Sequence, residues 1–474
     1  MRFTVTLLAA LALFVTGLPG AAAATGGDRP SFDEIDSFVS DYLHRHGLAG
    51  ASISVVKDGR ILHTAGYGDT GEKRATSDTP MVLGSVSKSI TAFAVLQLVD
   101  AGKVALDDPV VEHLPEFELD DPRTSQITVR QLLSQTSGLP SPTIVPPAAD
   151  LTQAVARLGD WQLGADPGER HAYSNANFWL AARLVEVLSG SDFATYLDRN
   201  VFEPLGMAAT RAVQDLGADD PGLQHGHVTA YGMALPMPEM EQFVAGAGGV
   251  ISTAEDMGRW LATLTDQGRT PGGEQLLSPR LLEEAQSPQP GSTDYGLGWS
   301  ISGPDVKPTR VGHSGTSSSH SAQMDVVPSS GYGVVVLLNS FTPTFEHNYA
   351  ISDGVIEVTE GNSASPGVPV ATLIDAGLGL VSLAVLVLAV FGVRRAQGWA
   401  NKRSGWPVWR FALRLIPQLV FPVLAVLTFV VLPSLQNNTA TPVDVFGAWP
   451  AALVLLLTLA LSGVTLTGVR ILFR

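Results

Sequence analysis

The chain of 474 residues contains no cysteine, and this absence excludes several classes of function at once. Without thiols there is no disulfide framework, no cysteine nucleophile, no cysteine-ligated metal and no lipidated N-terminal cysteine. The chain also lacks a Gly-x-Ser-x-Gly elbow, which argues against an α/β-hydrolase, and a His-Glu-x-x-His metal motif. The histidines at 44–46 and 225–227 are therefore interpreted as loop residues. We expect neither a metal ion nor an organic cofactor.

Positive charge is scarce outside the C-terminal region. Residues 25–369 hold 20 basic against 43 acidic side chains, a net charge of about −23, whereas residues 370–474 hold eight basic against two acidic ones. Such an acidic domain repels a phosphate backbone, so nucleic acid is excluded as a partner. We attribute the acidity itself to solubility.

Apolar runs lie at both ends of the chain. Residues 1–24 have the basic, apolar and small-residue regions of a signal peptide, either cleaved or kept as an anchor. Near the C-terminus, the runs at 373–393, 411–432 and 449–469 are each long enough to cross a bilayer as a helix. The sequence thus predicts an exported domain over 25–360, a flexible linker over 361–369 and a membrane domain over 370–474 with three transmembrane helices that contact lipid.

Basic residues predict the orientation of these helices. Lysine and arginine gather in 394–410 and after residue 469, and the loop 434–446 has none. The positive-inside rule then places 394–410 and the C-terminus in the cytoplasm, and residue 369 outside. We therefore expect a multi-pass protein of the cell membrane whose large domain is extracytoplasmic. Asp375, near the start of the first apolar run, is expected to be hydrated at the interface.

Ser85 and Lys88 precede a long apolar run, 90–99, that ends near Gly102. The run is apolar on nearly all sides, which indicates a buried helix, and glycine is favoured just beyond a helix end. Residues three apart share a helix face, so the Lys88 amine is expected beside the Ser85 hydroxyl. Free N–H groups and the helix dipole in the first turn favour negative charge there. These are the conditions that activate a serine nucleophile.

The same Ser-x-x-Lys spacing occurs at Ser54 and Lys57, because so short a motif is expected about once by chance in a chain of this length. Residues 51–56 alternate like a strand and lead into a turn at 57–60. In a strand, residues three apart point to opposite faces. The context therefore favours Ser85 as the nucleophile.

Two further clusters follow in order, Tyr173-Ser174-Asn175 and His313-Ser314-Gly315. Together the three clusters resemble the Ser-x-x-Lys, Tyr-x-Asn and Lys/His-Thr/Ser-Gly motifs of the serine β-lactamase and penicillin-binding-protein superfamily. The resemblance runs from about residue 31 to 340 and is to the class C β-lactamase-related branch. The third motif begins with His and not Lys, and in this the chain resembles the DD-peptidase and esterase-like members more than the dedicated class C β-lactamases. Other blocks that carry it are 83–89, 106–110, 127–139, 203–207, 248–253 and 295–299.

The resemblance implies an α/β (α+β) fold of the β-lactamase/transpeptidase type, an antiparallel sheet flanked by helices with a helical lobe, and a site between the lobes. The pattern of the sequence agrees with it. Strand-like segments occupy 51–66 and return after about 296, and the stretch 85–285 between them is expected to be largely helical, with clear helices over 176–188 and 254–264.

The resemblance also implies a serine hydrolase that forms an acyl-enzyme from an amide, lactam or ester carbonyl, of D-alanyl-peptide carboxypeptidase, β-lactamase or esterase type. Its substrate would be a small molecule or a peptide, such as a cell-wall peptide or a β-lactam. Ser85 would attack, either Lys88 or Tyr173 would be the general base, and Tyr173 would protonate the leaving group. The resemblance implies further roles: the N–H groups of Ser85 and Thr316 as oxyanion hole, Asn175 to orient substrate and Lys88, and His313, Ser314 and Gly315 to line the pocket.

Two alternatives from other classes are a penicillin-recognising sensor and a catalytically dead binding module. The predicted cytoplasmic loop of residues 394–410 leaves no room for an output domain, and intact Ser85, Lys88 and Tyr173 argue against a dead site. One departure concerns the substrate. Many relatives have a glycine about four residues after the glycine of the third motif, where 316–320 has none. We expect the side chains there to narrow or reshape the rim of the site.

Overall fold

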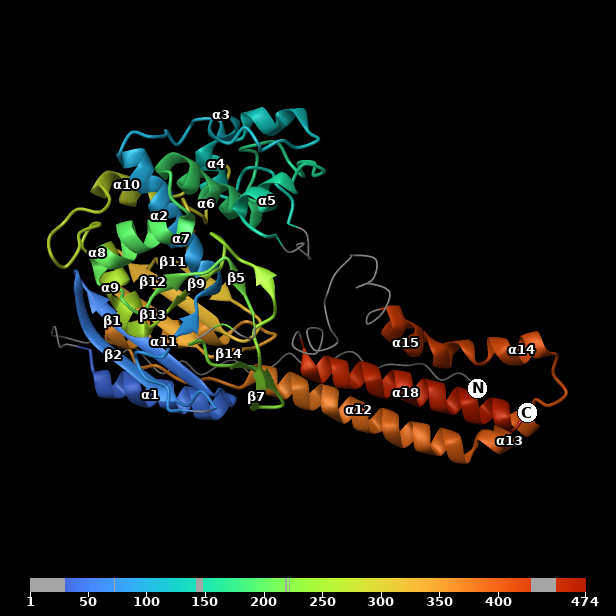
Figure 1. The fold of residues 1–474 in the computed structure, drawn as a ribbon. Coiled ribbons are helices and arrows are strands. Elements are labelled where there is room, and N and C mark those ends of the chain that lie inside the picture. The colour runs from blue at the N-terminus through green and yellow to red at the C-terminus, as the bar shows by residue number, and fades with distance from the viewer. Residues whose placement is uncertain (1–29, 72, 142–147, 218–219, 221, 428–448) are drawn as a thin grey trace.

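A computed structural model describes residues 30–71, 73–141, 148–217, 220, 222–427 and 449–474. The predicted signal peptide lies outside the described residues. Figure 1 shows a body of sheet and helices from which two long helices extend to one side.

One antiparallel sheet of six strands forms the centre of the body, in the order β10-β11-β12-β13-β1-β2. Its strands are β1 (Gly50–Lys57), β2 (Arg60–Gly68), β10 (Ser300–Ile301), β11 (Val311–Thr316), β12 (Ser321–Val327) and β13 (Tyr332–Leu338). The first strand pairs with the last along its length, from Ala51 opposite Leu338 to Lys57 opposite Tyr332. The predicted hairpin over 51–66 is confirmed. Ser54 lies in β1, and its hydroxyl contacts Thr64 Oγ1 across the hairpin at 3.2 Å.

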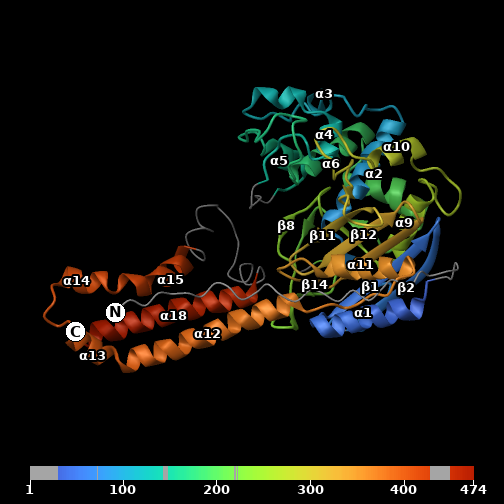
Figure 2. The ribbon, with the colours of Figure 1, turned by 180° about the vertical axis from the view of Figure 1, so that it is seen from behind.

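Helices cover both faces of this sheet, as the two opposite views show (Figures 1 and 2). On one face, α1 (Phe32–His46) and α11 (His347–Thr359) form a core with Ile53 of β1. On the other face, α9 (Ala254–Thr265) and α2 (Ser87–Asp100) pack over the alternate residues, with Val56 in their core. Successive side chains of a strand point to opposite faces, so β1 contributes to both cores.

A helical lobe is inserted between β2 and the C-terminal strands, and α2 joins it to the sheet. Its other helices are α3 (Val110–His113), α4 (Val129–Leu133), α5 (Leu151–Ala156), α6 (Ala176–Ser189), α7 (Phe193–Leu197), α8 (Glu203–Leu205) and α10 (Pro279–Ala285). The helices predicted over 176–188 and 254–264 are confirmed as α6 and α9. The expected combination of an antiparallel sheet and a helical lobe is therefore correct.

The expectation of a largely helical stretch is wrong for residues 211–252, which form short strands. These are β4 (Arg211–Ala212), β5 (Asp215–Leu216), β6 (Gly226–Ala230), β7 (Met233–Met237), β8 (Gln242–Phe243) and β9 (Val250–Ser252); two more, β3 (Met81–Val82) and β14 (Ser340–Phe341), pair with β9 and β6. Tyr231 and Gly232 both have positive φ, 53° and 73°. Two such residues form the tight turn that favours a hairpin over a helix.

Two helices of the C-terminal region are long and apolar enough to span a bilayer, α12 (Val370–Arg394) and α18 (Pro450–Leu472), with mean hydropathies of 2.6 and 2.2. The prediction of three spans is not matched within the described residues. The middle run gives two short helices, α14 (Val408–Leu413) and α15 (Ile416–Val426), and its end lies outside the described residues. Pro417 lies in the first turn of α15, where a missing N–H leaves no bond of that helix unmade. It cannot donate back to Leu413, so α14 does not continue into α15.

Asp375 joins the base of α12 to the body. Only 6% of it is exposed. Its Oδ2 accepts a hydrogen bond from the backbone N–H of Tyr231 at 2.8 Å, and its Oδ1 accepts one from Trp449 Nε1 at 3.0 Å. The expectation of a hydrated carboxylate is therefore wrong, because both oxygens hold protein donors at the tip of the β6–β7 hairpin and the start of α18.

Candidate active site

Ser85 lies in a 3₁₀ turn, Gly84–Val86, that continues into α2. The backbone of β11 presses directly against this turn. A Cβ on Gly84, which has φ +52°, would lie 2.5 Å from Thr316 N, and one on Gly315 would lie 1.9 Å from Leu83 O. Both positions therefore require glycine, and the close approach brings the main chain of Thr316 to the nucleophile.

Along β11, successive N–H groups point alternately toward β12 and away from it, and the N–H of Thr316 points toward the 3₁₀ turn that carries Ser85. Ser317 N donates to His320 O across the hairpin. Neighbouring residues of an antiparallel strand point their N–H groups in opposite directions, so that of Thr316 points away from β12. The N–H groups of Ser85 and Thr316 are thus near each other and available for an oxyanion.

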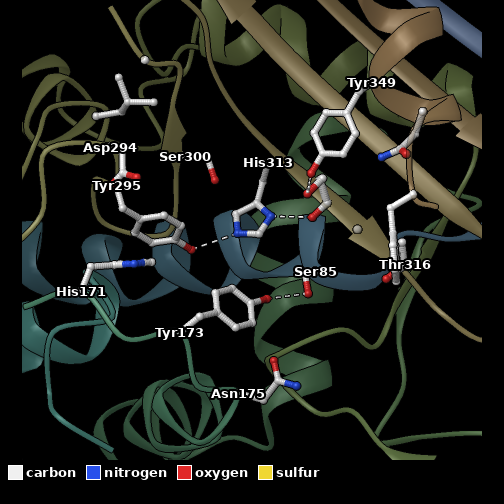
Figure 3. A pocket seen from close by; sticks show the side chains of 16 residues that line it. Ser85, His171, Tyr173, Asn175, Asp294, Tyr295, Ser300, His313, Thr316 and Tyr349 are labelled. Carbon is white, nitrogen blue, oxygen red and sulfur yellow. Dashed lines mark hydrogen bonds between the residues drawn. The ribbon is translucent and has the colours of Figure 1, made fainter. Parts of the chain in front are cut away.

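The Ser85 hydroxyl is in contact with both side chains that the sequence associated with it. Lys88 Nζ donates to Ser85 Oγ at 2.9 Å, and the Tyr173 hydroxyl donates to it at 2.7 Å (the latter bond is drawn in Figure 3). Lys88 comes from the first turn of α2, and Tyr173 from the segment before α6. The fold thus brings the hydroxyl of Tyr173, which lies 88 positions after Ser85, into contact with Ser85 Oγ.

Lys88 is wholly buried, with 0% exposed. Its Nζ also donates to Ala247 O at 2.6 Å and lies 4.9 Å from the centre of the Tyr173 ring. The loop that carries this carbonyl is tied to α2 by Thr91 Oγ1, which donates to Gly246 O at 2.7 Å. Burial lowers the pKa of Lys88 well below its ordinary value, because the charged amine is poorly solvated there. A neutral amine beside a hydroxyl can accept its proton.

Tyr173 is 38% exposed, and it lines the pocket beside Ser85. Desolvation in the cleft raises the pKa of Tyr173 to about 12, and the hydrogen bond to Ser85 only partly offsets it. The phenol is therefore protonated at neutral pH and can donate a proton. The lowered pKa of Lys88 suits it to accept a proton, and the raised pKa of Tyr173 suits it to donate one. This difference favours Lys88 as the base in the free site.

The third motif lies on β11, and its histidine is neutral. His313 Nδ1 lies 2.6 Å from the carbonyl oxygen of Ser314, which can only accept, so Nε2 accepts from the Tyr295 hydroxyl at 2.9 Å. Burial lowers the pKa of His313 to about 3. On the α11 side, the Tyr349 hydroxyl donates to Ser314 Oγ at 2.6 Å (Figure 3).

Sequence reasoning assigned no role to Tyr295 or Tyr349. Tyr295 lay within a block that carried the family resemblance, so a signal for it existed. Tyr349 follows no motif, and only the packing of α11 brings it to the site. Asn175 lines the pocket as expected. It makes no hydrogen bond to Lys88 in the described structure, where the second partner of that amine is the Ala247 carbonyl.

A pocket of about 720 Å³ opens beside these groups. It is formed by both lobes, and its lining residues are Ser85, His171, Tyr173, Asn175, Asp294, Tyr295, Ser300, Ile301, Gly303, His313, Ser314, Gly315, Thr316, Phe345, Asn348 and Tyr349 (Figure 3). All the residues predicted to bind substrate are among them. Lys88 does not line the pocket, and its amine lies behind Ser85, in contact with Ser85 Oγ.

Of the side chains that follow the third motif, Thr316 lines this pocket, and Thr316 and Ser317 line a smaller pocket that also contains Ser85. Residues 317–320 bond to Glu239, whose Oε1 accepts from Ser317 Oγ, from Ser319 Oγ at 2.7 Å and from His320 Nδ1 at 2.8 Å, while Oε2 accepts from Ser318 Oγ at 2.6 Å. Burial alone would raise the pKa of Glu239, but these bonds outweigh it and hold the pKa at about 2. The turn between β11 and β12 is therefore fixed by one buried carboxylate. Of the five side chains expected to narrow or reshape the rim, Thr316 and Ser317 border the site, and Ser318, Ser319 and His320 are held by Glu239.

This sheet with its helical lobe and a serine held by lysine and tyrosine define a serine hydrolase of the β-lactamase and penicillin-binding-protein type. The model of the Beta-lactamase family matches residues 35–354, and the chain belongs to this family.

Known proteins show the same relationship at low identity. Protein flp of Staphylococcus aureus (strain N315) is 28% identical over 323 residues, which are 65% of this chain and 63% of that protein. The structure of the octameric penicillin-binding protein homologue from Pyrococcus abyssi matches with a TM-score of 0.59 and 24% identity, over 70% of this chain and 78% of that one. A D-stereospecific amidohydrolase from Streptomyces sp. matches with a TM-score of 0.57 and 24% identity, over 70% and 98%. Both structures share the fold.

Proposed function

We propose that the protein hydrolyses an amide, lactam or ester through an acyl-enzyme on Ser85, as a D-alanyl-peptide carboxypeptidase, β-lactamase or esterase. The observation that carries the proposal is the contact of one hydroxyl oxygen with Lys88 Nζ at 2.9 Å and with the Tyr173 hydroxyl at 2.7 Å. Such an arrangement supplies a nucleophile, an acceptor for its proton and a donor for the leaving group within one hydrogen-bonded unit.

The steps follow from the protonation states. Neutral Lys88 takes the proton of Ser85 as the oxygen attacks the carbonyl carbon, and the carbonyl oxygen becomes an oxyanion held by the N–H groups of Ser85 and Thr316. Tyr173 donates its proton to the leaving group, and the proton on Lys88 restores the phenol. Water then attacks the acyl-enzyme by the same transfers in reverse, which releases the acid and regenerates Ser85.

The test of the proposal is covalent labelling of the intact protein with a fluorescent penicillin and with a fluorophosphonate. Ser85→Ala is expected to abolish labelling by both probes. Ser54→Ala is the matched control, because Ser54 has the same Ser-x-x-Lys spacing but lies in a strand, and it is expected to label like the native protein. Labelling that persists in Ser85→Ala, or a native protein that neither probe labels and that hydrolyses no activated ester, overturns the proposal.

We also propose that this site works outside the cell membrane, with a signal peptide over 1–24, a hydrolase domain over 25–360, a linker over 361–369 and a membrane domain from 370. The support comes from α12 and α18, which lie side by side and run away from the body (Figures 1 and 2). Their 25 and 23 residues are enough to cross a bilayer at about 1.5 Å per residue.

The far ends of these helices carry a cluster of cations and aromatic rings, which supports the orientation. Arg403 and Arg470 lie over the Trp399 ring at 4.3 and 4.2 Å, and Arg410 lies over Trp406 at 4.5 Å. Tryptophan is typical of either membrane interface, and arginine is enriched on the cytoplasmic side. The body at the opposite ends would then face the outside, with residues 394–410 and the C-terminus in the cytoplasm.

A further inference from the structure

The pocket beside Ser85 offers a substrate no cationic side chain. Among the described residues that line it there is neither lysine nor arginine, and there is one carboxylate, Asp294. Lys88 is the nearest amine to the nucleophile, but it is wholly buried beneath Ser85, and its Nζ donates hydrogen bonds to Ala247 O and Ser85 Oγ. It therefore presents no charge to the pocket.

The histidines of the pocket do not replace that missing charge. His313 has both ring nitrogens engaged, by Tyr295 and by the carbonyl of Ser314, and burial keeps it neutral. His171 lies against the Tyr295 ring at 5.1 Å between centres, and burial lowers its pKa as well. Because both imidazoles are neutral at pH 7, Asp294 is the charged side chain among the described residues that line the pocket.

Asp294 is exposed at one side of the pocket, where Ser292 Oγ donates to its Oδ1 at 3.1 Å. Figure 3 shows Asp294 and Tyr349 on opposite sides of His313. A carboxylate bound next to Ser85 would find only neutral donors and would be repelled by Asp294, whereas an ammonium group would be attracted to it. The net charge of the exported part, about −23, acts in the same direction on an approaching substrate.

The other side of the pocket is aromatic. Phe345 and Tyr349 are 50% and 44% exposed there. Phe345 has φ +59°, a conformation that is costly for a bulky residue and that persists only where the surrounding structure enforces it. Its ring packs edge-on against Phe341 at 5.2 Å between centres. This side therefore suits an apolar group.

We infer that the site selects esters and amides that carry no carboxylate beside the scissile bond, with an apolar group against Phe345 and Tyr349 and with an amine favoured at Asp294. The inference rests on the proposed function and names its substrate class. Among the reaction types of the proposed function, the inference therefore selects the esterase or amidase type. Peptides that end in a free carboxylate at the leaving residue, and β-lactams with a carboxylate on the ring, would be poor substrates.

The test uses the full chain in detergent with three aryl acetates that differ in one group: 4-acetoxybenzamide, 4-acetoxybenzoate and 4-(aminomethyl)phenyl acetate. Each kcat/KM is divided by the rate constant for alkaline hydrolysis of the same ester, which corrects for intrinsic reactivity. The neutral ester is expected to exceed the carboxylate by at least about tenfold, roughly the worth of one charge-assisted hydrogen bond. The ammonium ester is expected to equal or exceed the neutral one.

Variants of Asp294 then test the cause. Asp294→Asn should bring the three values closer together, and Asp294→Lys should move the preference toward the carboxylate. Asp160→Asn, an exposed aspartate outside the pocket lining, is the control and should leave the ratios unchanged. If the carboxylate ester has the same corrected kcat/KM as the neutral ester, or if Asp294→Asn changes no ratio, the inference alone fails. If no ester turns over and Ser85 is not labelled, the proposed function fails and the inference falls with it.

Discussion

Removal of the two proton-transfer groups beside Ser85 should reveal whether they act as one unit. Lys88→Met keeps much of the volume of the buried side chain and removes its amine, and Tyr173→Phe removes only a hydroxyl. Each variant is expected to slow acylation by about 100- to 10,000-fold, the usual worth of a positioned acid–base group. In free energy this is about 2.7 to 5.4 kcal/mol of barrier, at about 1.36 kcal/mol for each factor of ten.

The structure predicts how the two losses combine. Both groups contact the same oxygen, at 2.9 and 2.7 Å, so the loss of either interrupts the same transfer. The double variant should therefore be little slower than the slower single one. Independent contributions would instead add their barriers, and the double variant would then be slower by about 10⁴- to 10⁸-fold. The two cases differ by at least two orders of magnitude.

The assay is single-turnover acylation by a p-nitrophenyl ester, followed by the release of nitrophenol, with each variant checked for native thermal unfolding. Lys88→Arg provides a further comparison, because a guanidinium keeps its proton near neutral pH and cannot act as a base. Additive losses, or an active Lys88→Arg, would show that Lys88 is only an electrostatic neighbour of Ser85, and the reasoning above would be refuted.

Other expectations follow from the same structure. Because the base must be neutral, kcat/KM should rise as the pH rises through the lowered pKa of Lys88; a pH profile that is flat up to pH 10 and falls only above it would contradict this. Gly315→Ala should cost more than 100-fold in acylation and lower the melting temperature, since its Cβ would lie 1.9 Å from Leu83 O; native kinetics would contradict the close approach. A reporter fused at residue 369 should behave as extracytoplasmic and one at 402 as cytoplasmic; an active extracytoplasmic reporter at 402 would reverse the proposed orientation.

The sequence predicted most of the nucleophile's surroundings because those relations are local. Ser85 and Lys88 lie one helical turn apart. The strand-like alternation of residues 51–56 distinguished them from Ser54 and Lys57. The position of Tyr173 against Ser85 came from a family resemblance and not from spacing, since no local rule relates residues so far apart in sequence.

The features that sequence reasoning missed depend on tertiary contacts. Ser318 and Ser319 follow the third motif and were expected at the rim, but Glu239, from a separate segment, accepts hydrogen bonds from both. Asp375 looked like an interfacial carboxylate, and its donors come from a hairpin and from a second apolar helix. For the β6–β7 hairpin itself, Gly232 was a local signal, but tyrosine is not favoured at positive φ, so the pair Tyr231-Gly232 did not predict the turn.

The pairing of β1 with β13 sets an order for the assembly of the site during synthesis. Ser85 and Lys88 can meet as soon as α2 forms, but Thr316 reaches them only with β11, and β1 remains an unpaired edge on that side until β13 arrives. Contacts between such distant strands are slow to form. A nascent chain that ends before β13 therefore has Ser85 and Lys88 without the fully paired sheet that holds the N–H group of Thr316 against them. The first apolar helix, α12, follows that point in the chain, and the domain can close before this helix is made.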